Sequence, residues 1–466
     1  MLALTLKKEW LESKREGRSL WLGGIILLLL VCALFSGWHN YQQLQSQKHQ
    51  VSQSERERWL NQGEKDPHSA AHYGVYIIKP DSALAVLDPG LSDYLGSVLR
   101  LEAHKKNDTL FRPIQDAIQM QRFGSLNPAF ILQMLLPLLI ILLGFHSIAA
   151  ERESGTLKQL LAGGISVRKF FVAKVLALTG LGLLFFAPVV LHLIASLLLS
   201  ESSDAGRSLL FSLSYCVYIF IWALLTVIVS CFARSARGAL ILLLVIWCLA
   251  CLLVPKFAIA DAASRYPTES AQVFQSKLES EIYTPERQQA IEAFKQQTLA
   301  QYGVDDVANL PFAWSGAQLQ FAENYSDQVF DRLYGQRQGQ LEAQSSHYQG
   351  SALFSPFIAL QSLSMAAAAT DLTHHQLFDD AGEAHRRLMQ KALNNDLRDN
   401  GHKGEHGYQA DREVWQKIPD FHYQYPPASE LFASYGWAAL GLLQWLLTLL
   451  GVAYLAMLRL EKEGQQ

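Results

Sequence analysis

Charged side chains are scarce in this chain of 466 residues: Asp, Glu, Lys and Arg make up only 17% of it. Half of the residues are hydrophobic, and the formal net charge is −3. Intrinsic disorder requires low hydrophobicity with high net charge, so this composition excludes a disordered chain. The 30 glycines and 15 prolines follow no collagen or solenoid period, which excludes fibrous and repeat proteins.

Cysteine is also rare. All five cysteines fall within long apolar runs: Cys32, Cys216, Cys231, Cys248 and Cys251. The hydrophilic parts of the chain therefore contain no disulfide bonds, and we expect packing alone to stabilise them. Cysteines in an apolar span act as small hydrophobic residues. We therefore assign no redox or metal role to the C-x-x-C spacing of Cys248 and Cys251.

Several motifs of catalysis and binding are missing as well. No G-x-x-x-x-G-K followed by Ser or Thr is present to cradle ATP phosphates, and neither G-x-S-x-G nor H-E-x-x-H occurs. The sequence also has no basic stripe, which argues against nucleic acid as a partner. We therefore predict a protein that is not an enzyme and has no cofactor of its own.

Long apolar runs are abundant. A bilayer core of about 30 Å is crossed by a helix of about 20 apolar residues. Six stretches reach this length: residues 20–38, 128–150, 170–199, 209–232, 237–255 and 431–458. The first is too long for a signal peptide, and no small-residue cleavage site follows it. We predict an α-helical integral membrane protein with six transmembrane helices.

Basic residues beside alternate spans predict the orientation. They lie in residues 1–19, in the loop 151–169, just before residue 237 and in the tail 459–466. We expect this short tail to fray. Basic flanks stay in the cytoplasm, so both termini are predicted to be cytoplasmic.

The two longest segments between spans, residues 39–127 and 256–430, then lie on the extracytoplasmic side. Both are far longer than ordinary loops. We predict one large domain, built from these two insertions, that is mainly α-helical with some β-structure.

Local patterns within this domain predict its elements. Residues 74–80 and 97–102 have the composition of short strands bounded by turns. Thr284-Pro285-Glu286 is typical of a helix start. Further helices are expected over residues 321–348 and 370–398, and residues 40–65 are expected to continue the first span as a helix.

The amino-terminal segment combines apolar and basic residues. Trp10 with Lys14, Arg15 and Arg18 has the chemistry of a helix lying at the membrane surface. A plain basic flank, required by the orientation rule, is an equal alternative.

The most specific motif follows the second span, at residues 151–161. Charged Glu151, Arg152 and Glu153 precede Gly155 and Thr156, where a glycine permits a change of direction and Thr can cap a helix. Three leucines follow at helical spacing and would anchor that helix: Leu157, Leu160 and Leu161. An ordinary charged loop is the alternative reading.

This motif resembles the permease subunits of type-2 ABC exporters. The resemblance implies a short cytoplasmic helix that meets a separate ABC ATPase dimer, which would bind ATP and Mg. It also implies a second permease subunit, identical or paralogous, and a multi-pass location in the bacterial inner membrane. Lys158 and Gly163-Gly164 depart from the family pattern, in which an acid and a proline are common.

The two large insertions are similar to a bacterial subset of that family whose exterior part is a domain of unknown function. The residues that carry this likeness are Asp66-Pro67-His68, Ala71-His72-Tyr73-Gly74, Leu87-Asp88-Pro89-Gly90, Glu102-Ala103-His104, Arg122-Phe123-Gly124, residues 362–366, residues 370–375 and residues 415–421. The resemblance spans nearly the whole chain and names no substrate.

Metal-binding chemistry has only weak candidates. His374 and His375 lie beside Asp371 and Asp379, with His402 and His406 further along, but their spacing fits no known metal site. Thr370 or Asp371 also suits a helix cap, so no metal is predicted. Two histidines within spans, His146 and His192, could face an interior cavity or reach interfacial water.

The sequence thus predicts the permease subunit of an ATP-driven exporter. One alternative is mechanotransmission, in which the same ATPase stroke acts on a periplasmic partner and nothing crosses the membrane. A membrane-anchored receptor or scaffold is a third possibility, although a scaffold needs no coupling helix.

Overall fold

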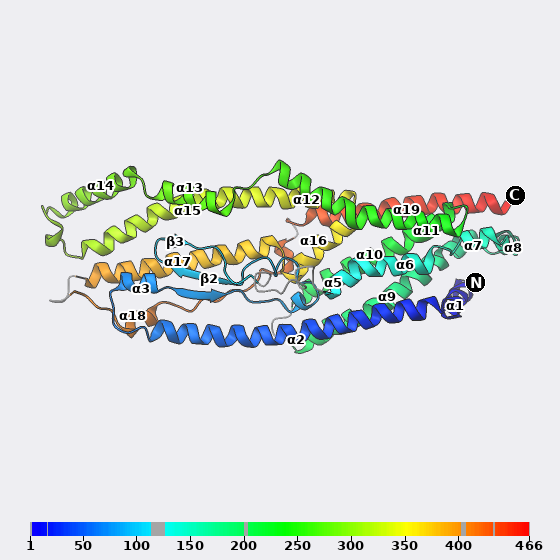
Figure 1. The fold of residues 1–466 in the computed structure, drawn as a ribbon, viewed down its shortest axis with the longest axis horizontal. Coiled ribbons are helices and arrows are strands. Elements are labelled where there is room, and N and C mark those ends of the chain that lie inside the picture. The colour runs from blue at the N-terminus through cyan, green and yellow to red at the C-terminus, as the bar shows by residue number, and fades with distance from the viewer. Residues whose placement is uncertain are drawn as a thin grey trace.

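The computed structural model describes residues 2–15, 17–112, 126–199, 204–401, 407–431 and 434–465. The molecule is long and mostly helical, with both termini at one end (Figure 1). One half is a bundle of apolar helices. The other half is a domain of helices around a small sheet.

Six helices are long and apolar enough to cross a membrane, as predicted: Ser19–Leu60, Pro128–Glu153, Val167–Leu199, Ala205–Phe232, Ala236–Arg265 and Gly436–Glu463. In five of them the helix extends beyond the predicted apolar run at one or both ends. The sixth begins five residues later than predicted, at Gly436, and continues past residue 458. Hydropathy marks only the apolar part of a helix, because backbone hydrogen bonding continues through polar helix formers.

These spans comprise the following elements. The first is α2 (Arg18–Leu60), and the second contains α5 (Pro128–Phe130), η3 (Ile131–Leu135), α6 (Leu136–Gly144) and α7 (Ala149–Glu153). The third to sixth are α9 (Val167–Leu199), α10 (Ala205–Phe232), α11 (Ala236–Cys248) continued by η4 (Leu249–Leu253) and α12 (Val254–Arg265), and α19 (Gly436–Gln465).

Two of the spans contain a π-helical turn just before a proline. The turns η3 and η4 precede Pro137 and Pro255. A proline has no N–H to donate and its ring crowds the preceding turn, and a locally widened turn relieves that crowding. Both spans therefore stay continuous despite their prolines.

Helix α10 forms the centre of the bundle. Its aromatic residues Phe211, Tyr215, Tyr218 and Trp222 are buried among α6, α9, α11 and α19. Gly182 of α9 allows close packing here, since a Cβ on it would lie 2.6 Å from the Cγ2 of Ile219. Most of the apolar part of this helix is buried, whereas α9, α11 and α19 each keep exposed apolar residues.

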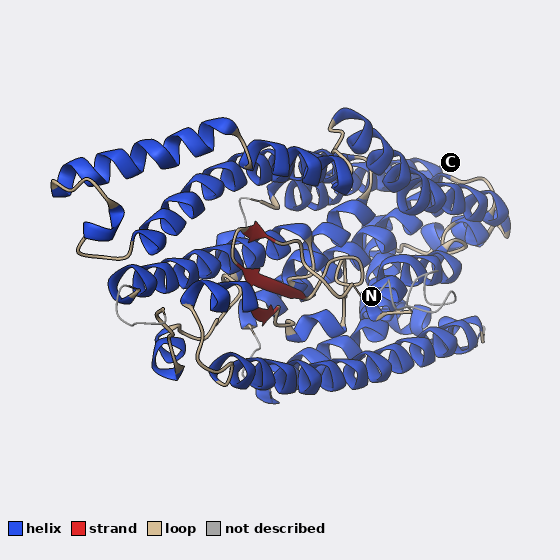
Figure 2. Ribbon diagram, turned by 60° about the vertical axis from the view of Figure 1, so that its left-hand side comes forward, coloured by secondary structure: helices blue, strands red, loops and turns tan. Residues whose placement is uncertain are grey.

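The sheet has three antiparallel strands in the order β1 (Val75–Ile78), β2 (Val98–Glu102) and β3 (Lys105–Lys106). Val75 pairs with Leu101, and Ile78 pairs with Val98. The two predicted strands are confirmed, and β3 is too short to have been predicted. Figure 2 shows the sheet enclosed by helices.

Helix α17 (Leu372–Asn400) covers the sheet at close range. A Cβ on its Gly382 would lie 2.6 Å from Leu99 and 2.9 Å from Ile77. Both long segments between the apolar spans contribute to this core, since Trp59 and Trp415 pack edge to face. The Trp59 indole also donates to the Trp415 carbonyl at 3.0 Å.

The remaining helices of the domain are α3 (Pro67–Tyr73), α13 (Ala271–Ile282), α14 (Pro285–Tyr302), α15 (Trp314–Gly350), α16 (Pro356–Ala368) and α18 (Arg412–Lys417), with single 3₁₀ turns η1 (Ala83–Val86), η5 (Val307–Asn309), η6 (Ser351–Leu353) and η7 (Ala428–Leu431). Thr284 caps α14 and Asp371 caps α17, as their sequence patterns predicted. Helices α15 and α17 include the two further helices expected from the sequence.

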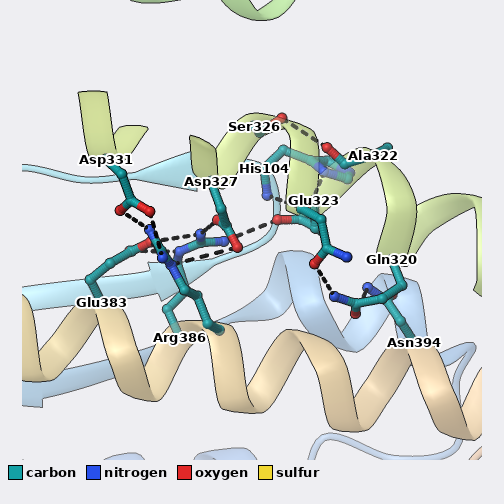
Figure 3. Close-up of polar contacts among 12 residues, drawn as sticks. His104, Gln320, Ala322, Glu323, Ser326, Asp327, Asp331, Glu383, Arg386 and Asn394 are labelled. Atoms are coloured by element: carbon teal, nitrogen blue, oxygen red, sulfur yellow. Dashed lines mark hydrogen bonds and ion pairs between the residues drawn. The ribbon is translucent and has the colours of Figure 1, made fainter. Parts of the chain in front are cut away.

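A group of charged side chains joins α15 to α17 (Figure 3). Arg386 is almost completely buried and pairs with Glu323 at 3.1 Å, Glu383 at 2.8 Å and Asp327. A buried charge is stable only when it is paired and hydrogen-bonded. Arg386 therefore fixes the position of α15 on α17.

Candidate functional site

The motif at residues 151–161 lies at the end of the molecule that holds both termini. There, α7 and α8 (Thr156–Ala162) lie near α1 (Leu2–Arg15) and the end of α19 (Figure 1). The domain with the sheet occupies the opposite end.

The expected single helix is in fact two short helices. Gly155 joins them with φ of +76°, a left-handed conformation that glycine adopts without strain. The predicted change of direction at Gly155 is confirmed. Thr156 does not cap α8, because it is the first residue of that helix and Gly155 holds the cap position.

The Thr156 side chain instead stabilises the turn from within. Its hydroxyl donates to the carbonyl of Glu151 at 3.2 Å and also lies against the Glu151 carboxylate. At the start of α7, the hydroxyl of Ser230 in α10 accepts hydrogen bonds from the backbone N–H groups of Ile148 and Ala149, both at 3.0 Å. The segment is thus tied to the central helix of the bundle.

The three leucines anchor the segment to the bundle. Leu157 is buried, and Leu160 and Leu161 are half-buried against the same core as the spans. The helical spacing of the leucines therefore reflects packing inside this chain.

Two charges of the motif pair with other elements. Glu151 binds Lys8 of α1 at 3.3 Å. Arg152 binds Glu463 of α19 at 2.9 Å and donates to the Ala233 carbonyl at the end of α10, also at 2.9 Å. Glu151 and Arg152 are therefore braces within the chain.

The pairing of Glu463 corrects the expectation of a frayed tail. Helix α19 continues to Gln465, and Glu463 contacts both Arg152 and Arg459. Apolar content predicted the end of the span. The partner Arg152 lies in α7, 311 residues away in the chain, and this contact could not be seen in the sequence.

Helix α1 is fastened by a second ion pair. Lys174 of α9 is buried and binds Glu9 at 2.7 Å. Trp10 and Arg15 are exposed, and the side chains of Lys14 and Arg18 lie outside the described ones. A helix is present as predicted, and its packing on α9 fixes it to the bundle.

A cavity of about 340 Å³ lies behind these braces. Its lining includes Glu9, His146, Ser147, Glu151 and Lys174. His146, singled out in the sequence as an intramembrane histidine, therefore lies beside the charged braces at the end of the second span.

The outward surface of the segment consists of the side chains that these contacts leave exposed. They belong to Glu153, Ser154, Lys158, Gln159 and Ala162. Of the eight predicted coupling residues, only Glu153 and Gly155 are fully exposed. Sequence reasoning missed Lys8, Glu9, Lys174 and Glu463, whose partners are too distant in the chain to leave a local pattern.

The weak metal candidates are not brought together. His374 is buried, with one ring nitrogen 2.7 Å from Asp371 and the other 3.0 Å from the guanidinium of Arg207. His375 points instead to Thr109 at 3.2 Å. Burial alone would raise the pKa of Asp371, but hydrogen bonds from His374 and Tyr435 more than offset this and lower that pKa. His402 and His406 lie outside the described residues.

Two parts of the chain match known families. Residues 109–260 match a family described as ABC-2 family transporter protein, and residues 270–424 match a domain of unknown function, DUF3526. Together, the two matches are consistent with an ABC-2 transporter permease that carries an added domain of unknown function. No curated protein and no solved structure matches the chain.

The resemblance seen in the sequence is thereby confirmed. The ABC-2 permease family suggests a transmembrane component of an ABC transporter, and it implies partnership with an ABC ATPase and a membrane. Permeases of this family are generally not catalytic. Helices α7 and α8 fall within the matched residues 109–260.

Proposed function

We propose that a separate ATPase dimer docks on the exposed face of α7 and α8 and drives this permease as an exporter. A second permease subunit, identical or paralogous, would complete the transporter. In this arrangement ATP and Mg are bound by the ATPase, both termini lie in the bacterial cytoplasm, and the domain with the sheet is extracytoplasmic. The proposal rests on the family, the basic flanks and the form of the α7–α8 segment.

The observation that carries the proposal is the bracing of this segment. A displacement of α8 cannot be absorbed locally, because Glu151 links α7 to α1 and Arg152 links it to α19 and α10. Packed elements tend to move as rigid bodies, so a push on α8 would move several spans together. A loop with no coupling role would not need three separate attachments.

The test separates the outward surface from the braces. Glu153→Lys combined with Lys158→Glu reverses the exposed charges while keeping the net charge of the chain. We expect recovery of the permease on a tagged ATPase to fall about tenfold, equivalent to about 1.4 kcal/mol. Membrane insertion and thermal stability should stay unchanged, because both side chains are exposed.

The matched control is Glu286→Lys with Lys295→Glu on α14, at the far end of the molecule. Recovery on the ATPase should equal that of the wild type. If the α7–α8 pair also retained full recovery and full ATP turnover in nanodiscs, the docking proposal would be wrong and the scaffold reading would take its place.

Mechanotransmission has a specific observation in its favour. Helix α2 runs unbroken for 43 residues, from the α1 end of the molecule into the domain. At 1.5 Å per residue it is about 65 Å long, roughly twice the bilayer core. ATP-dependent distance changes between spin labels on the domain, without any transported substrate, would favour this second function over export.

A further inference from the structure

Three histidines form a compact group on the surface of the domain. His68 and His72 belong to α3, and His104 lies in the turn between β2 and β3. One nitrogen from each lies within 4.8 Å of the others. Among the described residues, no other group of His, Cys, Asp and Glu satisfies this criterion.

Local structure holds the first two histidines side by side. Asp66 caps α3 by accepting hydrogen bonds from the N–H groups of His68 and Ser69, and Pro67 occupies the first helical position. Residues four apart lie on one face of a helix. As a result, the Nε2 atoms of His68 and His72 are 3.2 Å apart.

This separation is close to the one that a tetrahedral metal imposes. Zinc binds histidine nitrogen at about 2.0–2.1 Å, so two such nitrogens on one ion lie about 3.3 Å apart. The ring centroid of His104 is 5.1 Å from that of His68 and 5.2 Å from that of His72. A small side-chain movement would bring its nitrogen to the same ion.

His104 is oriented by a buried carboxylate. Glu323 of α15 lies 2.5 Å from Nδ1 of His104 and accepts a hydrogen bond from its backbone N–H at 3.0 Å (Figure 3). This contact leaves Nε2 as the available ring nitrogen. His104 has φ of +62°, an uncommon conformation for a residue other than glycine.

The contact between Glu323 and His104 is of a kind common at metal sites. A metal-binding histidine usually donates its second ring N–H to a carboxylate, which fixes the ring and strengthens the ligand. Burial would raise the pKa of Glu323, but His104 and Arg386 more than offset this and lower it, so the carboxylate stays charged.

We propose that His68, His72 and His104 form a binding site for one divalent transition metal ion, with zinc as the preferred occupant. Imidazole suits zinc and copper, and the site offers no sulfur ligand that would select Cu(I). Three protein ligands leave one position of a tetrahedral ion open. His72 is exposed, so that position can take water or a donor group from a partner.

An occupied site would connect four parts of the domain. The ion would bridge α3 and the β2–β3 turn, and Glu323 extends this link to α15 and to Arg386 of α17. The site is far from α7 and α8 (Figure 1). The metal-binding proposal can therefore be tested independently of the ATPase-docking proposal.

The test uses the full chain without an affinity tag, stripped with chelator and titrated with Zn²⁺ alone. We expect one zinc per chain in calorimetry and elemental analysis, and a rise in the thermal midpoint with zinc concentration. Cobalt added in place of zinc should give the absorption of a tetrahedral site. Absence of stoichiometric zinc, or zinc that gives no thermal shift, would overturn the proposal.

Variants separate the site from general zinc adsorption. His72→Gln changes an exposed ligand, so the metal-free protein should unfold at the wild-type temperature while zinc affinity falls at least 100-fold. His49→Gln removes another exposed histidine, on α2, and should leave zinc binding unchanged. Equal affinity in His72→Gln and His49→Gln would refute the site.

Glu323→Gln tests the positioning role of the carboxylate. Loss of such a partner typically lowers metal affinity 10–100-fold. Because Glu323 also pairs with Arg386, the thermal midpoint of the metal-free variant is measured in parallel. Lower stability with unchanged zinc affinity would show that Glu323 serves only the charged group between α15 and α17.

Discussion

At the scale of the residue, the charged motif after the second span divides into two kinds of side chain. Arg152 and Glu151 face other helices of the chain, whereas Glu153 faces outward. A charge pattern alone does not distinguish them, since both kinds look equally polar in the sequence. Burial and pairing therefore assign bracing to the first kind, and the proposed docking surface consists of the second kind.

Removing the Arg152 brace should lower the stability of the bundle slightly and the coupling between the ATPase and the spans strongly. Arg152→Ala leaves Glu463 without this partner and frees the Ala233 carbonyl. We expect about 1–2 kcal/mol lower stability, the usual cost of unpaired, partly buried groups. ATPase-stimulated turnover should fall while ATPase recovery stays normal. Arg168→Ala, whose pair with Glu461 is mostly exposed, is the matched control and should change neither.

The hinge at Gly155 should tolerate little besides glycine. A Cβ there meets no atom within 4 Å, so any effect comes from its positive φ. We expect Gly155→Val to cost about 1–2 kcal/mol, and Gly155→Asn to cost less, because Asn visits this conformation more readily. Circular dichroism melts in detergent would measure both. Gly180→Ala, with equal space but ordinary helical φ, should be neutral; a similar loss there would refute the strain argument.

At the scale of the element, the contact between α15 and α17 depends on one buried cation. Arg386→Met would leave Glu323, Glu383 and Asp327 without it. Breaking a buried pair from one side costs about 3–5 kcal/mol. Arg387→Met changes the adjacent, more exposed arginine and should cost less than about 1 kcal/mol. Thermal unfolding of the two variants would show whether burial decides the difference.

A buried carboxyl where the domain meets the bundle should make stability depend on pH. Asp88 bonds to Ser364 of α16 at 2.5 Å, and Gln133 of η3 approaches at 3.4 Å. Burial raises the pKa of Asp88 above 3.8, although these hydrogen bonds partly oppose the rise. The folded protein then holds this proton more tightly than the unfolded chain. The contribution of Asp88 is therefore largest at low pH and falls as pH rises through its raised pKa.

Asp88→Asn keeps a neutral side chain at every pH and should remove this fall. The difference in thermal midpoint between wild type and variant should change with pH above 3.8. Exposed Asp305→Asn serves as the control and should track the wild type. Parallel pH profiles for wild type and Asp88→Asn would show that Asp88 does not titrate in this range.

At the scale of the whole molecule, the sequence predicted the features that depend on residues close together in the chain. Six apolar runs, two strands and the caps of α14 and α17 were all visible, because each depends on neighbouring residues. The ion pairs around α7 were not visible, since Lys8 and Glu151 are 143 residues apart. The histidine group was half visible: His68 and His72 at helical spacing after Asp66-Pro67 were a usable signal, but nothing linked them to His104.

The arrangement of the molecule predicts which sites face which side of the membrane. Gln340 on α15 and Lys462 on α19 are both exposed, and their helices reach opposite ends. In a background with the five cysteines replaced, Gln340→Cys should react with an impermeant maleimide once the outer membrane is opened. Lys462→Cys should react only after the inner membrane is also opened. The reverse order would invert the predicted orientation.

The buried Arg207 at the start of α10 has a consequence for biogenesis. Its guanidinium donates to the Ala366 carbonyl at 2.9 Å and to the Pro426 carbonyl, groups that are translated about 160 and 220 residues later. When α10 enters the membrane during synthesis, these acceptors do not yet exist. The fourth span therefore inserts before these two hydrogen bonds can form, and Asp204, three residues earlier and 3.5 Å from the guanidinium, is the acidic partner already present. The hydrogen bonds of Arg207 are thus completed only when the later part of the domain closes onto the bundle.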